Sequence, residues 1–140
     1  ELPENSSSPR CVWLTENDGE IFNRHLCLCG KAPREDDFLR NIYKSGSARY
    51  CLLFENGLPV ARGAVEPYSD GMWEAADFYT AREYRVRGLA KEILRHVAAE
   101  IIRQGKIVSC RTERGNTAMI KIMEHMGFQK DDNGGNKFEG

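Results

Sequence analysis

The chain has no large excess of either charge and no long apolar run, and each absence argues against one class of partner. Its 140 residues carry 20 Lys and Arg against 21 Asp and Glu, which gives a formal net charge of −1. Non-specific nucleic-acid binding depends on many basic residues that neutralise phosphates, so the balanced charge argues against that activity. No stretch of the sequence is apolar for long enough to span a bilayer. We therefore expect neither a nucleic acid nor a membrane as a partner.

The chain also lacks the even set of cysteines that marks a small disulfide-bonded domain. It has five cysteines, and two of them, Cys51 and Cys110, lie in apolar runs that look like strands. Reduced, partly buried thiols in a cytoplasmic protein explain this pattern. The group His25-x-Cys27-x-Cys29 resembles part of a metal site, but no second pair of ligands follows at zinc spacing. We therefore expect no metal.

The length of the chain fits one compact domain behind a short polar segment. Residues 1–10 include three serines and two prolines and have no apolar core. We expect them to be a disordered lead-in and not a signal peptide. The domain is then expected to cover residues 11–140. The oligomeric state stays open at this point, with a homodimer among the options.

Periodicity and turn residues predict an alternation of strands and helices. Apolar residues at helical spacing predict helices, and apolar runs between turn signals predict strands. The pair Asn56-Gly57 lies between two such runs and is a strong signal for a hairpin. The predicted strands are 11–14, 49–54, 58–65, 72–80 and 106–111, and the predicted helices are 20–29, 33–44, 88–104 and a last one that Asn116 opens. A weak final hairpin is expected in 129–140, and the strands within 49–80 should form an antiparallel meander.

The segment between the strand ending at Thr80 and the next helix predicts a phosphate site. It reads Arg85-Val86-Arg87-Gly88-Leu89-Ala90, so small residues lie at the start of the helix. The first backbone N–H groups of a helix have no partner within the helix and lie at the positive end of its dipole. A phosphate binds there when no bulky side chain blocks it. A single glycine at a helix start is often only a turn residue, so the neighbouring sequence must support this prediction.

Two motifs together resemble the GNAT superfamily of acyl-CoA-dependent N-acetyltransferases. The signature of that family, Arg/Gln-x-x-Gly-x-Gly/Ala after the fourth strand, is matched by Arg85, Gly88 and Ala90. A second landmark is an Asn that opens the last helix, followed at a fixed spacing by Gly-Phe, and Asn116 and Gly127-Phe128 match it. The resemblance implies an α/β (α+β) fold with a mixed, mostly antiparallel sheet. It further implies about six to seven strands, about four flanking helices, and fourth and fifth strands that splay apart.

The resemblance also implies the co-substrate and the reaction. Acetyl-CoA (coenzyme A) would donate an acetyl group to a primary amine of a small molecule or a protein. The pantothenate arm would pair with the backbone of the fourth strand, as an added strand does, and the pyrophosphate would rest on the start of the following helix. The expected cofactor contacts are Phe78, Tyr79, Thr80, Arg85, Val86, Arg87, Gly88, Leu89, Ala90 and Asn116.

Direct attack of an amine on a thioester needs a base for the proton of the amine and a donor for the developing oxyanion. By resemblance to the histone-acetylating members, the base is Glu74, which strand alternation places on the same face as Phe78. The oxyanion donor is expected to be the backbone N–H near Phe78. Asp77 is a rival base that lies on the opposite face unless a β-bulge reverses the alternation, and Glu66 is a third.

One position departs from the family pattern. Many members carry a tyrosine on the last helix that protonates the departing thiolate, and this chain has Met123 there, which cannot donate a proton. Either Tyr79 or Tyr84 replaces it, or the thiolate leaves unassisted, or the domain binds acyl-CoA without catalysis. The last option is the alternative function, and a generic phosphate-binding or protein-interaction module is a third. The acceptor amine has no recognisable signature in the sequence.

Overall fold

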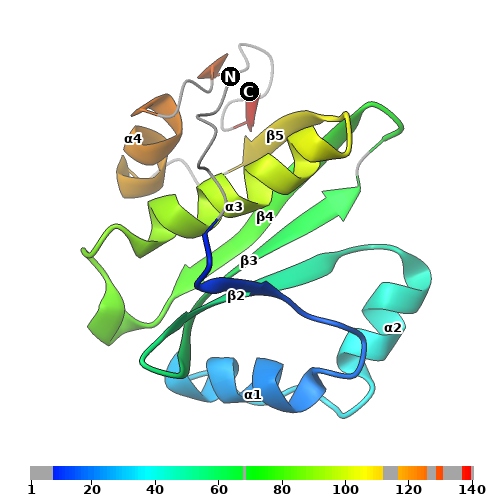
Figure 1. Cartoon of the computed structure of the whole chain (residues 1–140), viewed down its shortest axis with the longest axis vertical. Coiled ribbons are helices and arrows are strands. Elements are labelled where there is room, and N and C mark those ends of the chain that lie inside the picture. The colour runs from blue at the N-terminus through cyan, green and yellow to red at the C-terminus, as the bar shows by residue number, and fades with distance from the viewer. Residues whose placement is uncertain (1–7, 68, 112–116, 126–128, 131–136, 140) are drawn as a thin grey trace.

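The structure, a computed structural model, describes residues 8–67, 69–111, 117–125, 129–130 and 137–139. These residues form one seven-stranded sheet in the order β1-β2-β3-β4-β5-β7-β6, with helices on both faces (Figure 1). The strands are β1 (Cys11–Trp13), β2 (Arg49–Glu55), β3 (Leu58–Pro67), β4 (Met72–Thr80), β5 (Ile107–Arg111), β6 (Gln129–Lys130) and β7 (Lys137–Glu139). The helices are α1 (Gly19–Leu28), α2 (Phe38–Ser45), α3 (Leu89–Arg103) and α4 (Thr117–His125), and a short 3₁₀ helix covers Arg82–Tyr84.

The predicted fold class is confirmed. Every neighbouring pair of strands is antiparallel except β4 and β5, which are parallel. The hairpin between β2 and β3 turns at Asn56 and Gly57, whose φ angles of 51° and 78° are those that a tight hairpin turn requires. Among the residues that the structure describes, no helix is long and apolar enough to cross a membrane.

Helix α2 begins at Phe38, five residues later than the expected start at residue 33. The cause is a pair of hydrogen bonds that hold the preceding loop to α1. The Asn23 side chain donates from Nδ2 to the Arg34 carbonyl at 3.0 Å and accepts from the Arg34 N–H at 2.8 Å. In a helix that began at residue 33 the Arg34 carbonyl would accept from the Phe38 N–H, whereas here the Asn23 amide binds that carbonyl and the Phe38 N–H donates to the Glu35 carbonyl.

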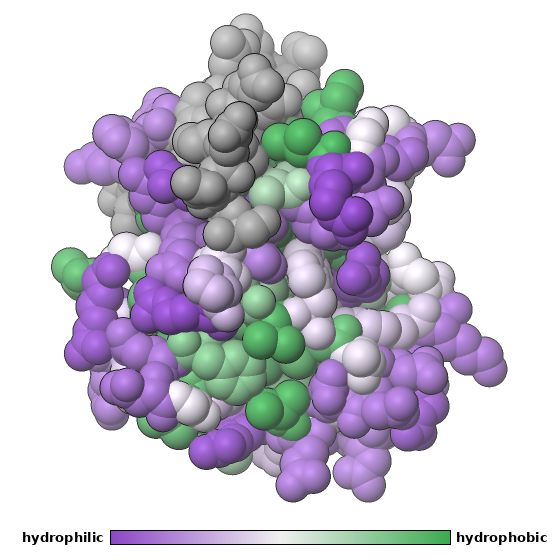
Figure 2. All heavy atoms as spheres, in the orientation of Figure 1, coloured by the Kyte–Doolittle hydropathy of each residue, from purple (hydrophilic) through white to green (hydrophobic). Residues whose placement is uncertain are grey.

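The two faces of the sheet have separate hydrophobic cores. Helices α1 and α2 cover one face, and α3 and α4 cover the other (Figure 1). The α3 face includes Val65, Ala75, Ile93, Val97, Cys110 and Met123, and the α1 face includes Phe22, Leu26, Leu39, Tyr50, Leu52 and Ala64. Hydrophilic side chains cover most of the outer surface in the space-filling view, with hydrophobic residues grouped mainly near its middle (Figure 2).

Strand β4 contains a β-bulge in its second half. Arg62 of β3 pairs with Tyr79, whereas Ala64, only two residues further along β3, pairs with Ala76. Strand β4 therefore has one residue more than β3 across this interval, and Asp77 adopts a left-handed φ of 53° there. Such a bulge leaves the extra residue unpaired in the ladder and reverses the alternation of faces beyond it.

The bulge corrects one expectation about faces. Simple alternation places Glu74 and Phe78 on the same side of the sheet, but the Phe78 ring packs in the α3 core. A Cβ atom at Gly63 would lie only 2.5 Å from Cε1 of Phe78 and 3.2 Å from Cγ2 of Val97. Glu74 lies in line with Ala76 on the α1 face. Because the extra residue intervenes, Asp77 also lies on the α1 face, together with Glu74.

The fourth and fifth strands separate as expected. Their parallel register begins at Met72 with Ile107 and ends at Ala75 with Cys110. Strand β4 continues to Thr80, so within the described residues its second half has no strand partner on the β5 side. The separation begins one residue after the last pair, directly before the bulge.

Candidate active site

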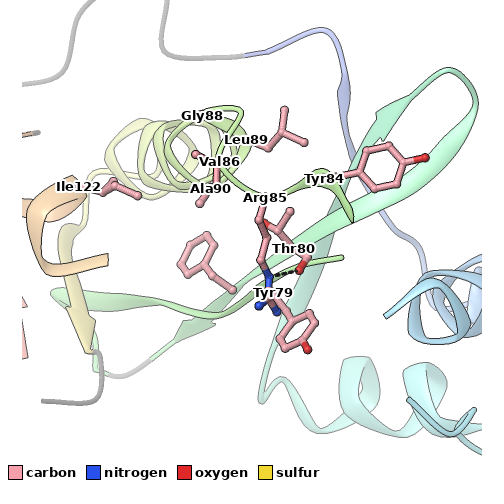
Figure 3. Close-up of a pocket in the computed structure, with 10 residues that line it drawn as sticks. Tyr79, Thr80, Tyr84, Arg85, Val86, Gly88, Leu89, Ala90 and Ile122 are labelled. Atoms are coloured by element: carbon pink, nitrogen blue, oxygen red, sulfur yellow. Dashed lines mark hydrogen bonds between the residues drawn. The ribbon is translucent and has the colours of Figure 1, made fainter. Parts of the chain in front are cut away.

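A pocket of about 550 Å³ lies where β4 ends and α3 begins (Figure 3). Its walls come from the second half of β4, the connecting loop, the first turn of α3, and one residue of α4. The lining residues are Phe78, Tyr79, Thr80, Tyr84, Arg85, Val86, Gly88, Leu89, Ala90 and Ile122. The structure thus brings together all the expected cofactor contacts except Arg87 and Asn116. Asn116, with Gly127 and Phe128, lies outside the described residues.

The start of α3 has backbone N–H groups that can bind an anion. Gly88 precedes the helix with a φ of 77°, and no side chain among the described residues caps the helix there. The first helical hydrogen bond runs from the Glu92 N–H to the Gly88 carbonyl at 3.1 Å. The N–H groups before Glu92 therefore have no partner within the helix. A Cβ atom at Gly88 would meet no heavy atom within 4 Å, so the approach to these groups is open.

The loop before α3 is held in an unusual conformation. Val86 is fully exposed and has a φ of 64°, which is a rare and strained angle for a β-branched residue. Arg85 ties the loop to β4, because its Nε donates to the Thr80 carbonyl at 2.9 Å (Figure 3). Its guanidinium also lies 5.1 Å from the centroid of the Tyr79 ring. Nothing in the sequence indicates the left-handed angle at Val86.

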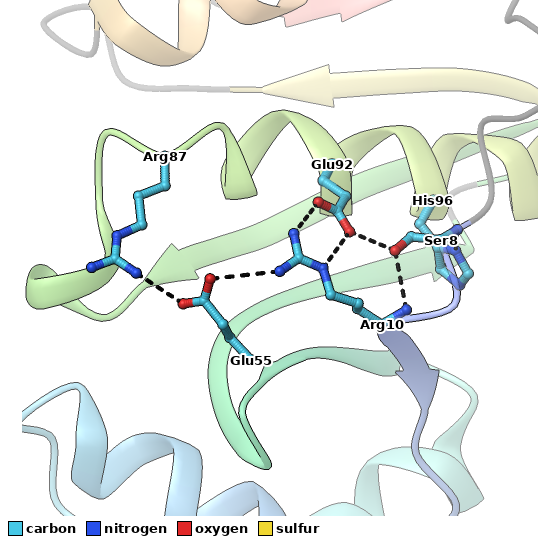
Figure 4. A network of polar contacts seen from close by, with 6 residues as sticks. All are labelled: Ser8, Arg10, Glu55, Arg87, Glu92 and His96. Carbon is cyan, nitrogen blue, oxygen red and sulfur yellow. Dashed lines mark hydrogen bonds and ion pairs between the residues drawn. The ribbon is translucent and has the colours of Figure 1, made fainter.

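Arg87 is turned away from the pocket. Its Nη1 lies 3.1 Å from a carboxylate oxygen of Glu55, the last residue of β2 (Figure 4). Glu55 also attracts Arg10, and Arg10 binds Glu92 on α3 through two hydrogen bonds. The Ser8 hydroxyl donates to Glu92 as well. The Arg10 guanidinium holds the pKa of Glu92 below its usual range.

The polar contacts in Figure 4 join the last residues of the expected lead-in, Ser8 and Arg10, to helix α3. Residues 1–7 lie outside the described residues, and residues 8–10 lie along α3. The Ser8 N–H donates to Nδ1 of His96 at 2.9 Å, which places the proton of that neutral imidazole on Nε2. Burial lowers the pKa of His96.

The opposite face of β4 carries the candidate bases. Glu74 lies directly across from Glu66 on β3 and from Ser109 on β5, and the Ser109 side chain is buried. Burial, together with the nearby Glu74 carboxylate, raises the pKa of Cys110 to about 12. The thiol therefore stays protonated at neutral pH and is not a nucleophile. Asp77 belongs to the same face and is bound to two side chains.

Three residues around Asp77 were not identified from the sequence. The Tyr50 hydroxyl donates to Oδ2 of Asp77 at 2.9 Å, and Nη2 of Arg62 donates to Oδ1 at 3.0 Å. Nη1 of Arg62 lies 3.3 Å from Nε2 of His25, which is fully buried. Burial lowers the pKa of His25 to about 4. These residues come from β2, β3 and α1, so no local motif in the sequence connects them.

The two candidate acids, Tyr79 and Tyr84, have access to the pocket, whereas Met123 does not. Met123 has no proton to donate, and its side chain is fully buried in the α3 core. Tyr79 and Tyr84 both line the pocket. The Arg87 guanidinium lies 5.2 Å from the Tyr84 ring centroid. Sequence reasoning had placed both tyrosines near the motif but had not included Tyr84 or Ile122 among the cofactor contacts.

The His25, Cys27 and Cys29 group is not arranged as a metal site. Nδ1 of His25 lies 2.8 Å from the Pro59 carbonyl, which can only accept, and Nε2 faces Arg62. Cys27 is exposed. Throughout the part of the chain that the structure describes, no three His, Cys, Asp or Glu side chains are grouped so as to hold a metal ion.

The sheet opens between β4 and β5 and a pocket lies at the start of α3, and comparison with known proteins shows which family has this arrangement. The sequence profile of the acetyltransferase (GNAT) family matches residues 19–128. The chain therefore belongs to the GNAT acetyltransferase family. No curated protein matches the chain in sequence.

Solved structures of similar fold agree with this assignment. A putative GNAT acetyltransferase from Novosphingobium aromaticivorans is 21% identical with a TM-score of 0.72, and the match covers 99% of this chain but only 57% of that one. The ribosomal-protein-S18-alanine N-acetyltransferase from Escherichia coli is 15% identical over 92% of this chain and 88% of its own, with a TM-score of 0.65. The putative acetyltransferase yncA from Salmonella typhimurium, solved with its cofactor acetyl-CoA, is 16% identical over 92% and 89%, with a TM-score of 0.63.

Proposed function

We propose that this protein is an N-acetyltransferase that moves an acetyl group from acetyl-CoA to a primary amine by direct attack. The observation that carries the proposal is the pocket where the second half of β4 meets the uncapped start of α3. The acceptor is a small molecule or a protein amine. Family membership supports the reaction class, and the presence of acetyl-CoA in the yncA structure supports the co-substrate.

The residues present fit coenzyme A. The pocket combines a strand edge at Phe78, Tyr79 and Thr80, which has no strand partner on its β5 side among the described residues, with N–H groups after Gly88 that have no partner within the helix. A strand edge suits an extended arm with amide groups, and helix N–H groups suit a pyrophosphate. The proposed cofactor contacts are those expected from the sequence, with Tyr84 and Ile122 added as walls of the pocket.

Glu74 and the Phe78 backbone are the proposed catalytic groups. Acetyl-CoA supplies an acetyl group that is already activated as a thioester. An alkyl amine is mostly protonated at neutral pH, so the Glu74 carboxylate takes a proton before or during attack. The Phe78 N–H donates to the carbonyl oxygen as negative charge develops there. The C–S bond breaks as the amide forms, and the departing sulfur takes a proton from Tyr79, Tyr84 or solvent. Because this role belongs to the backbone of Phe78, it does not depend on the face that the ring occupies.

The alternative function is a domain that binds acyl-CoA without catalysis. The specific observation in its favour is Met123, which is buried where many family members have a proton donor. Turnover with a panel of primary amines, measured beside CoA binding, separates the two functions. Binding without turnover of any amine favours the alternative.

The proposed function is tested first by cofactor binding. Acetyl-CoA at a hundred times its dissociation constant should stabilise the protein by roughly 2.7 kcal/mol and raise the Tm by about 5–10 °C. Gly88→Glu should abolish the shift, because it places bulk and negative charge before the open N–H groups. Gly88→Ala is the matched control, since it adds the same strain at a φ of 77° but only a methyl group in open space. An equal shift in wild type and Gly88→Glu would place the pyrophosphate elsewhere.

We also propose that residues 11–140 form a single domain and that the protein acts in the cytoplasm. None of the five cysteines is in a disulfide, which is usual in a reducing compartment.

Size-exclusion chromatography with light scattering determines the oligomeric state and shows whether the protein is a homodimer. Accessibility to impermeant thiol reagents in intact cells tests the location through the exposed thiol of Cys27.

A further inference from the structure

The bulge in β4 puts a non-glycine residue in a conformation that needs support. Asp77 has a φ of 53°, and neither Asp77 nor Phe78 has a partner in the β3–β4 register. Asp tolerates the left-handed region better than most residues, but the conformation is still strained. It persists only when the surrounding structure holds it in place.

The Asp77 carboxylate is held from two other strands. Tyr50 of β2 donates to one oxygen and Arg62 of β3 to the other, at 2.9 and 3.0 Å. Burial and the neighbouring carboxylate raise the pKa of Tyr50, so its hydroxyl stays a donor at any physiological pH. The Asp77 side chain is 38% exposed, whereas that of Arg62 is 12% exposed. The Arg62 side chain that holds Asp77 is therefore mostly buried, and the Asp77 carboxylate lies nearer the surface.

Arg62 is itself fixed. Its second terminal nitrogen donates to Nε2 of His25, and Nδ1 of that ring donates to the Pro59 carbonyl. The tautomer follows because a carbonyl can only accept. The Arg62 guanidinium also lies 5.3 Å from the centroid of the Tyr79 ring. Arg62 thus contacts the residues on both sides of Phe78, namely Asp77 and Tyr79.

Strand β3 has a glycine opposite the bulge, which leaves room for the Phe78 ring. Gly63, next to Arg62, has no side chain, and the Phe78 ring occupies the space that a Cβ atom would need. The ring packs against Val97 of α3 on the other face. The backbone of Phe78 is therefore fixed by its ring on one face of the sheet and by the Asp77 carboxylate on the other.

We infer that Asp77 is a positioning residue for acetyl transfer: Tyr50 and Arg62 hold its carboxylate so that the bulge keeps the Phe78 N–H aimed at the thioester carbonyl. This inference rests on the proposed function. Both carboxylate oxygens of Asp77 are bound by the side chains of Tyr50 and Arg62, which suits a positioning role. The carboxylate acts through the backbone, and that distinction can be tested.

The decisive comparison is Asp77→Gly against Asp77→Ala. Both variants remove the carboxylate, but glycine adopts a positive φ without strain and alanine does not. Positioning through the backbone predicts that Asp77→Gly retains at least fivefold more turnover than Asp77→Ala. If the carboxylate itself took part in the reaction, the two variants would be equally impaired. Equal turnover in the two variants overturns the inference.

A second readout reports the Phe78 N–H directly. The chain has six phenylalanines, so ¹⁵N-phenylalanine labelling gives a simple spectrum, and Phe78→Leu assigns the resonance. In wild type, acetyl-CoA should move the Phe78 amide resonance farther than CoA does. That difference should fall by at least half in Tyr50→Phe and Asp77→Ala and be kept better in Asp77→Gly. An undiminished difference in Tyr50→Phe and Asp77→Ala contradicts the inference.

Tyr43→Phe is the matched control. Tyr43 of α2 is also a partly buried tyrosine, whose hydroxyl donates to the Leu14 carbonyl and accepts from the Tyr50 N–H. Its loss removes comparable hydrogen bonds without touching Asp77. Tyr50→Phe should lower turnover about tenfold relative to Tyr43→Phe at similar Tm. If acetyl-CoA does not bind wild type, the proposed function fails and this inference fails with it. If wild type is active and Tyr50→Phe equals Tyr43→Phe, only this inference fails.

Discussion

The phosphate cradle that we propose at the start of α3 and the bulge in β4 are close together along the chain, yet they are built differently. The cradle, residues 85–90, uses backbone N–H groups of consecutive residues and is open to solvent. The bulge is held by the side chains of His25, Tyr50 and Arg62, which come from three elements. A change in the cradle should therefore act on binding of the cofactor, and a change at the bulge on catalysis and stability.

The largest effect is expected at Glu74, on the bulge side of the strand. Glu74→Gln should lower turnover by roughly 10²–10⁴-fold, which is the usual contribution of a positioned general base. The Tm shift with acetyl-CoA should be unchanged, because Glu74 is not among the residues that line the pocket. Steady-state rates with the best amine of a panel measure the first effect. Glu66→Gln tests the third candidate base, which pairs with Glu74 from β3, and should stay within about fivefold of wild type if Glu74 is the base.

If Glu74→Gln keeps turnover within a few-fold, then Glu74 is not the base. In that case Glu66 becomes the next candidate, or the amine arrives already deprotonated. If Glu74→Gln keeps its turnover but loses the Tm shift with acetyl-CoA, then Glu74 contributes to cofactor binding and not to proton removal.

Acidification should weaken the bulge through His25. Its folded pKa of about 4 lies below the ordinary value near 6.5, so the unfolded chain binds the proton more tightly. The stabilisation is complete above about pH 6.5 and is lost as the pH falls toward 4. This loss amounts to about 3 kcal/mol of unfolding free energy. Urea unfolding between pH 7 and 4.5 measures it.

His25→Gln should flatten that pH dependence, and His96→Gln provides the comparison. Burial lowers the pKa of His96 as well, but His96 lies on α3 near the N-terminal segment and does not contact the bulge. An unchanged slope in His25→Gln would mean that His25 is not the group that titrates.

Gly63→Ala should disturb the bulge from the α3 face. The new Cβ atom would lie 2.5 Å from the Phe78 ring, so the ring or the strand must move. Overpacking of this kind costs about 1–3 kcal/mol. Urea unfolding at pH 7 measures the loss. Gly71→Ala is the control, because a Cβ atom there meets no heavy atom within 4 Å, and it should change the unfolding free energy by less than about 0.5 kcal/mol. Equal stability of the two variants would show that the Phe78 ring moves freely.

The smallest effect is expected at Arg87, which belongs to the cradle by sequence but points toward Glu55. Arg87→Gln should change CoA affinity by less than about threefold and stability by less than about 1 kcal/mol, since the Arg87 side chain is 53% exposed and its ion pair is screened by solvent. Arg85→Gln should weaken CoA binding by about tenfold, because Arg85 lines the pocket and holds the Thr80 carbonyl. Isothermal titration with CoA measures both. A reversed order would mean that Arg87 leaves Glu55 when the cofactor binds.

Several parts of this protein follow from its sequence because they are local. The bounds of β4 are those predicted, and the hairpin at Asn56-Gly57 follows from two residues that accept positive φ. The cradle is a motif of six consecutive residues, and its function depends on backbone groups that any helix start provides. For this reason the cofactor pocket contains almost every residue expected from the sequence. The late start of α2 was missed because Asn23 acts on Arg34 from eleven residues away.

The remainder was decided only in three dimensions. Alternation along β4 placed Glu74 and Phe78 on one face, but one extra residue at Asp77 reversed the order, and an Asp in a strand permits such a bulge without requiring it. The residues that hold Asp77 are 15 and 27 positions away in the sequence, and His25 lies 37 positions from Arg62. The sequence by itself determined the backbone motif that can hold a phosphate, since its hydrogen-bonding groups are neighbours along the chain. The tertiary structure decided which carboxylates share a face of the sheet and what holds the bulge, because those interactions form only when distant strands are brought into register.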